Sequence, residues 1–198
     1  MSKHWNDDPF TKKAQNEGYE ARSVYKLEEI DRREPILKGA QRIIDLGASP
    51  GSWAQYCLKK LPGCQILAID LSPLRVQDKR LTFVQADINE FNFTEAMGGH
   101  QADLVLSDMA PKTSGIHDQD VARSTDLAEM ALEVAKVHLK TGGSYVVKLF
   151  MGSSFEDYNK QMKSVFGQVR IIRPESTRKH SREIFLIGKN KRPAPIKI

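Results

Sequence analysis

Three aspartates end three successive apolar runs of the sequence. Asp70 ends the run 65–70, Asp87 ends the run 81–87, and Asp108 follows the run that begins at residue 102. Core packing alone does not require an acid at each of these positions, whereas open α/β sheets bind ligands at the carboxyl ends of their parallel strands. The sequence therefore predicts that three carboxylates meet in one crevice, where they accept hydrogen bonds from hydroxyl or amino groups.

A glycine turn precedes these acids and separates a short apolar strand, residues 42–46, from a helix with apolar residues at helical spacing. Gly47 and Gly51 would let the backbone approach a ligand that a Cβ would block. The G-x-G-x-x-G spacing that seats a pyrophosphate is missing, but Asp70 follows Gly51 by about 20 residues, as suits a ribose-binding acid. A plain turn between a strand and a helix is the simpler alternative.

Lys148 is an unusual residue for its position, because it follows an apolar run in a strand that is expected to be buried. A lysine at a strand end often extends its ammonium to solvent, which is one interpretation. The other is functional, since burial and a like-charged neighbour favour the neutral amine, which can accept a proton.

Five segments together resemble the FtsJ/RlmE family of S-adenosylmethionine-dependent ribose 2′-O-methyltransferases of ribosomal RNA. They occur in the family's order and span about residues 14–188: Arg22–Leu27, Asp45–Trp53, Ser107–Pro111, Gly142–Lys148 and Ser181–Glu183. Ser49 and Ser52 depart from the family's usual Ala and Gly, and both are small enough to leave cofactor binding intact.

The resemblance implies a catalytic Lys-Asp-Lys-Glu set around the target hydroxyl, called the tetrad below. Lys148 would accept the hydroxyl proton, with a neighbouring cation and two orienting carboxylates. Because Lys26 favours a neutral Lys148 while the carboxylates oppose it, the four groups would titrate as one coupled cluster. Its members are Lys26, Asp108, Lys148 and Glu183.

For S-adenosylmethionine, the resemblance implies that Gly47 and Gly51 admit the methionine part and that Asp70 holds the ribose hydroxyls. Asp87 would accept from the adenine amino group, or would simply be a turn residue at a strand end. Asp108 would lie near the sulfonium. Trp53 is expected to lie close to the cofactor. The alternative is that Trp53 has only a structural role and anchors the helix that follows the glycine turn.

The alternation of strands and helices predicts one α/β domain over residues 1–198, with a Rossmann-like, mostly parallel seven-stranded sheet and helices on both faces. An antiparallel strand is expected near one edge, formed by runs 169–172 and 184–187. Residues 1–20 are expected to be polar and loose, a helix is expected over 21–33, and 189–198 is expected to be a basic tail. The loop 111–120 is a candidate lid.

Composition limits the possible partners. The net charge is +5, and from Gln168 onward nine Lys or Arg face only two Glu, which favours a polyanionic partner. Residues expected to contact RNA are Arg22, Arg33, Arg178, Lys179 and Arg182. Two cysteines without a C-x-x-C pattern and five scattered histidines argue against a metal site. No apolar run has the length of a membrane span and no secretion signal is visible, so a cytoplasmic monomer is expected.

Two other function classes remain open. A nicotinamide-dependent reductase would use Asp70 to bind its cofactor, but the glycine fingerprint of that class is missing from this sequence. A catalytically silent ribosome-assembly protein would explain the basic segments but not four filled catalytic positions. Within the resemblance, a uridine in large-subunit ribosomal RNA is the expected substrate, because Met109 follows Asp108 where the transfer-RNA branch usually has Gly. A transfer-RNA ribose methyltransferase is the alternative.

Overall fold

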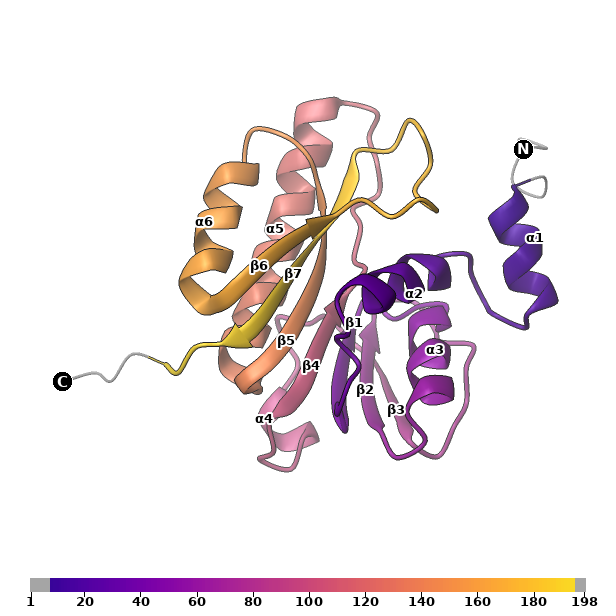
Figure 1. The fold of residues 1–198 in the computed structure, drawn as a ribbon, viewed down its shortest axis with the longest axis vertical. Coiled ribbons are helices and arrows are strands. Elements are labelled where there is room, and N and C mark those ends of the chain that lie inside the picture. The colour runs from indigo at the N-terminus through magenta and orange to yellow at the C-terminus, as the bar shows by residue number, and fades with distance from the viewer. Residues whose placement is uncertain (1–7, 195–198) are drawn as a thin grey trace.

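The computed structural model describes residues 8–194 and contains a seven-stranded sheet flanked by helices (Figure 1). The strand order is β3-β2-β1-β4-β5-β7-β6. Strands β1 to β5 pair in parallel, and β7 is antiparallel to both β5 and β6. The predicted Rossmann-like α/β architecture, with an antiparallel strand near one edge, is confirmed.

The strands and helices follow the expected alternation. The strands are β1 (Arg42–Leu46), β2 (Gln65–Asp70), β3 (Leu81–Gln85), β4 (Ala102–Ser107), β5 (Leu139–Phe150), β6 (Phe166–Ile172) and β7 (Glu183–Lys191). The helices are α1 (Pro9–Asn16), α2 (Val24–Arg33), α3 (Ser52–Lys60), α4 (Phe93–Ala96), α5 (His117–His138) and α6 (Phe155–Val165).

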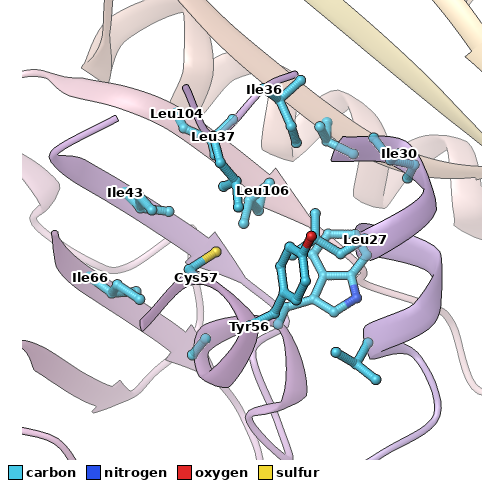
Figure 2. Close-up of a cluster of buried hydrophobic side chains, with 14 of the residues drawn as sticks. Leu27, Ile30, Ile36, Leu37, Ile43, Tyr56, Cys57, Ile66, Leu104 and Leu106 are labelled. Carbon is cyan, nitrogen blue, oxygen red and sulfur yellow. The ribbon is translucent and has the colours of Figure 1, made fainter. Parts of the chain in front are cut away.

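The two faces of the sheet carry separate hydrophobic clusters. On one face, Leu27 and Ile30 of α2 and Cys57 of α3 pack over alternate residues of the central strands, such as Ile43 and Leu104 (Figure 2). Helices α5 and α6 cover the other face. Since side chains alternate along a strand, each central strand must be apolar on both faces, and its continuous apolar run follows from that burial.

Helix α5 buries a different stripe from the one its sequence suggested. We expected Leu127, Met130, Ala131, Val134 and Val137 to form the packed face. Only Ala131 of these is buried, and Val137 is 62% exposed. The face on the sheet consists of small residues and one leucine, which let the helix approach closely: Val121, Ser124, Ala128, Ala131, Leu132 and Ala135. We also expected Gly142 and Gly143 to end this helix. Both lie within β5 instead, because the chain passes directly from α5 into that strand.

Regular secondary structure extends into both terminal segments of the described chain. Helix α1 lies in the segment 1–20 that was predicted to be loose, and buries Ala14 against the α2 and α3 side of the core. The predicted basic tail begins inside β7, where Lys191 donates to the backbone oxygens of Lys136 and Leu139 at the end of α5. The parts of these predictions at 1–7 and 195–198 lie outside the described residues. No helix among residues 8–194 has the length and apolar character needed to cross a membrane.

Candidate active site

A cavity of about 870 Å³ opens at the carboxyl ends of β1, β2, β3 and β4. The three strand-end acids Asp70, Asp87 and Asp108 all line it, so the structure brings together the carboxylates that the sequence placed in one crevice. The opposite wall consists of α5 side chains, among them Leu127 and Met130. Polar acids around a partly apolar cavity are suited to a ligand with hydroxyl or amino groups on an apolar body.

Gly47 lines this cavity and has to be a glycine. Its φ is +73°, and a Cβ there would lie 2.6 Å from Met109 Cγ, so any side chain would collide with the segment that follows β4. Gly51 does not line the cavity. Its φ is +121°, and a Cβ would lie 2.3 Å from Val76 Cγ2, so this glycine allows the 71–80 segment to approach the start of α3.

Asp70 and Asp87 each organise the loop that follows their strand. Asp70 accepts hydrogen bonds from the backbone N–H of Ser49 at 2.9 Å and of Ser72 at 2.7 Å. Asp87 Oδ1 accepts from the N–H and side-chain amide of Asn89, which is the turn role weighed above. Since both residues also line the cavity, the turn role does not exclude a contact with a ligand.

Trp53 lies away from the cavity. Its indole Nε1 donates to the backbone oxygen of Ser23 at 2.9 Å, its ring centroid is 5.9 Å from that of Phe185, and the residue is 2% exposed. This arrangement fastens α3 to the start of α2, as in the alternative interpretation. Trp53 is not among the residues that line the cavity. A direct contact between Trp53 and the cofactor therefore stays a prediction, without support from the cavity lining.

The tetrad is assembled as two ion pairs. Lys148 Nζ lies 2.9 Å from Asp108 Oδ1, and Lys26 Nζ lies 2.7 Å from Glu183 Oε1. The first pair follows from strand register, because Ser107 of β4 is aligned with Val147 of β5 and the next residues are Asp108 and Lys148. All four side chains are less than one-fifth exposed.

Glu183 reaches the tetrad from the antiparallel strand β7. Phe150 of β5 is aligned with Glu183, which places this carboxylate at the end of β5 where Lys148 is also found. Thr177 Oγ1 donates to Glu183 Oε1 at 3.2 Å, so the carboxylate is oriented by the β6–β7 loop as well as by Lys26. The pairing of Glu183 with Lys26 instead of Lys148 could not be seen in the sequence.

Asp45 is a candidate site residue that sequence reasoning did not single out. It is the last residue but one of β1, is 1% exposed, and neither carboxylate oxygen has a hydrogen-bond partner among the described residues. Burial, then the charges of Asp108 and Asp70, raise the pKa of Asp45 to about 8. An acid flanked by Ile43, Ile44 and Leu46 in a strand expected to be buried was the available signal.

The predicted RNA-contacting cations divide into two groups. Arg22 bonds to Asp8 and to the backbone oxygen of Ser176, which joins the N-terminal segment to the β6–β7 loop. Arg33 pairs with Glu29 at 3.3 Å and remains half exposed. The other three are exposed on the β6–β7 loop, beside the tetrad's Glu183: Arg178, Lys179 and Arg182. Within residues 8–194, no cluster of three metal-ligating side chains is present.

The chain is similar to known methyltransferases over most of its length. Residues 19–191 match the model of the FtsJ-like methyltransferase family. The chain is 46% identical over 191 residues to ribosomal RNA large subunit methyltransferase E of Bdellovibrio bacteriovorus, covering 93% of this chain and 97% of that one. It is 42% identical over 205 residues to the protein of the same name from Herminiimonas arsenicoxydans, covering 96% and 95%.

A solved structure described as a ribosomal RNA methyltransferase from Plasmodium falciparum has a TM-score of 0.79 and 28% identity, covering 89% of this chain and all of that one. The matched segment contains the cavity, the strand-end acids and the whole tetrad. The chain therefore belongs to the FtsJ-like methyltransferase family.

Proposed function

We propose that this protein transfers a methyl group from S-adenosylmethionine to the ribose 2′-hydroxyl of a uridine in large-subunit ribosomal RNA. The observation that carries the proposal is the position of Asp108, which lines the cavity and also pairs with the buried Lys148. One carboxylate thus connects a site for a cofactor with a group suited to accept a proton.

The residues present fit S-adenosylmethionine, a nucleoside that carries a positive charge. Asp70 and Asp87 offer carboxylate oxygens for ribose hydroxyls and an adenine amino group, and Asp108 offers a negative charge for the sulfonium. The missing Cβ of Gly47 lets Met109, which also lines the cavity, pack directly against the turn after β1. When bound, the cofactor supplies an activated methyl group.

The protein contributes alignment and a proton acceptor. Lys148 is 6% exposed, and its Nζ also donates to the backbone oxygen of Asp108 at 2.5 Å, so its position is determined by two contacts with one residue. A cationic cofactor would share Asp108 with Lys148, which favours the neutral amine as acceptor of the hydroxyl proton. Lys26, held in place by its ion pair with Glu183, would orient the ribose near Lys148.

The choice of substrate rests on the relatives and on the small basic surface. Both curated relatives described above carry the name ribosomal RNA large subunit methyltransferase E. The described basic residues next to the tetrad are few and lie on loops, which suits recognition of phosphates and shape more than base-by-base reading. We therefore propose an assembled or nearly assembled large subunit as substrate, bound by a single-domain monomer acting in the cytoplasm, where such particles are found.

The test offers three substrates at equal concentration: isolated large subunits from cells that lack this protein, the naked large-subunit RNA, and transfer RNA. We expect methylation of the subunits to be fastest, and mass spectrometry to locate the methyl group on a uridine ribose. Faster methylation of transfer RNA would contradict the substrate assignment, and no methylation of any RNA would support a silent assembly role.

A further inference from the structure

A second cavity, of about 600 Å³, lies at the same edge of the sheet as the tetrad. The roles assigned above do not explain why the residues that line it lie together. We call it the side pocket. It is lined by His117, Met151, Arg173, Arg182 and Ile184. These residues come from the ends of β5, β6 and β7 and from the start of α5, which meet at one end of the molecule (Figure 1).

The side pocket is joined to the tetrad through the chain itself. Arg182 and Ile184 flank Glu183, and Met151 is the third residue after Lys148. The N–H of Met151 donates to the backbone oxygen of Arg182 at 2.9 Å, which holds the end of β5 against the start of β7. A ligand in the side pocket would therefore be positioned relative to both ion pairs of the tetrad.

The lining of the side pocket combines apolar and basic side chains. Met151 is 41% exposed although most of its apolar neighbours in β5 are buried, and Ile184, the second apolar residue of the lining, is 5% exposed. Arg173 and Arg182 are the arginines of the lining, and within the described chain no carboxylate lines the pocket. Arg173 is held in place by its hydrogen bonds to the backbone oxygens of Lys179 and Ser181, at 3.2 and 2.8 Å.

This combination matches one nucleotide of a single strand of RNA. A base is a flat, apolar surface that packs well on a thioether or stacks on a guanidinium, and its phosphate needs a cation nearby. Resting on the function proposed above, we infer that the side pocket binds the base of a nucleotide adjacent to the methylated one, with Met151 and Ile184 under the base and Arg182 at its phosphate. This contact would hold the strand so that the target ribose reaches Lys148.

Substitutions at exposed positions test the inference without disturbing the core. Met151→Asp places a negative charge where the base would lie, and Met151→Leu keeps an apolar side chain. Val137→Asp is the matched control, because Val137 is 62% exposed at the far end of α5. Arg182→Gln removes the cation that is proposed to contact the phosphate, and Lys160→Gln on α6 is its control.

We expect Met151→Asp to raise KM for large subunits about tenfold or more with a smaller change in kcat, because a charge opposes both the base and the phosphate. Met151→Leu should remain within about twofold of the unchanged protein, since an apolar contact is kept. S-adenosylmethionine binding by calorimetry should be unchanged in all variants. Equal KM values in Met151→Asp and Val137→Asp, or a matching loss of cofactor affinity, would overturn the inference.

Two further measurements separate this inference from the proposed function. Binding of labelled large subunits, measured without methyl transfer, reports on the side pocket even if the unchanged protein methylates nothing. A photoreactive benzoylphenylalanine in place of Met151 should crosslink to RNA in the bound subunit, close in sequence to the methylated nucleotide. Crosslinking only to a ribosomal protein would overturn the inference and leave the proposed methyl transfer standing.

Discussion

Lys148 contacts Asp108 twice, through the carboxylate oxygen Oδ1 at 2.9 Å and through the backbone oxygen at 2.5 Å. The backbone contact remains whatever the charge of the Asp108 carboxylate, so it holds the Lys148 amine in position when that carboxylate also serves a cationic ligand. The second pair, Lys26 with Glu183, has no residue in common with the first. Under the proposed function the two pairs would have different roles: Lys148 would accept a proton and Lys26 would supply a positive charge.

Replacing Lys148 by Arg should separate the proton acceptor from the ion pair. Arginine can pair with Asp108 but does not give up its proton in proteins, so Lys148→Arg should lose about 10²–10⁴-fold in kcat, as Lys148→Ala should. Affinity for S-adenosylmethionine should stay within a few-fold in both variants. A tritiated-methyl assay and calorimetry measure the two quantities, and near-normal turnover of the Arg variant would refute Lys148 as the base.

Replacing Asp70 or Asp87 by Ala should weaken S-adenosylmethionine binding by about 1–3 kcal/mol. This is the cost of leaving a hydroxyl or amino group of the cofactor without an acceptor, or of losing a charged hydrogen bond. Calorimetry measures it. Because Asp70 also orders the Ser49 and Ser72 backbone, Asp70→Asn is needed beside Asp70→Ala to separate ligand contact from loop structure. Unchanged affinity in both Ala variants would show that the adenosine binds elsewhere.

Binding of large subunits should weaken steeply as the salt concentration rises. Basic side chains release counterions from the RNA phosphates, and this release gives a smaller free-energy gain when the surrounding salt concentration is high. Arg178→Gln combined with Lys179→Gln should reduce the slope of log K against log[salt] by up to about two. The same two-charge change on α6, at Lys160 and Lys163, should leave the slope unaltered. Filter binding over a salt series measures it, and a flat response of the unchanged protein would argue against a phosphate-contacting surface.

Asp45 should make stability fall as pH rises. The pKa of Asp45 is raised to about 8 in the folded protein, while an unfolded aspartate has a pKa near ~3.9. Between these values the folded chain keeps a proton that the unfolded chain has released, so the unfolding free energy decreases from about pH 4 to pH 8 and then levels off.

The variant Asp45→Asn removes this titration. The difference in unfolding free energy, variant minus unchanged protein, should therefore be larger at pH 8 than at pH 5, by on the order of a few kcal/mol. Denaturant unfolding at both pH values measures the difference. Asp157→Asn, at an exposed position on α6, is the control and should show no such increase. An equal difference at pH 5 and pH 8 would mean that Asp45 is ionised in the folded protein.

Local patterns in the sequence were sufficient for the order and type of most elements and for the strand-end acids. A strand buried on both faces is mostly apolar, and a position with positive φ favours glycine, so β1 and the turn at Gly47 are visible without a structure. The family resemblance supplied the tetrad, because its four residues lie in separate segments whose proximity no local pattern reveals.

Only the tertiary structure decided which groups face one another. Strand register pairs Lys148 with Asp108, the position of α2 pairs Lys26 with Glu183, and packing against Phe185 turns Trp53 away from the cavity. The small-residue face of α5 was also decided there, since a helix against a sheet selects residues by fit as well as by hydrophobicity. Each of these outcomes depends on contacts between residues far apart in the chain, which composition and spacing do not encode.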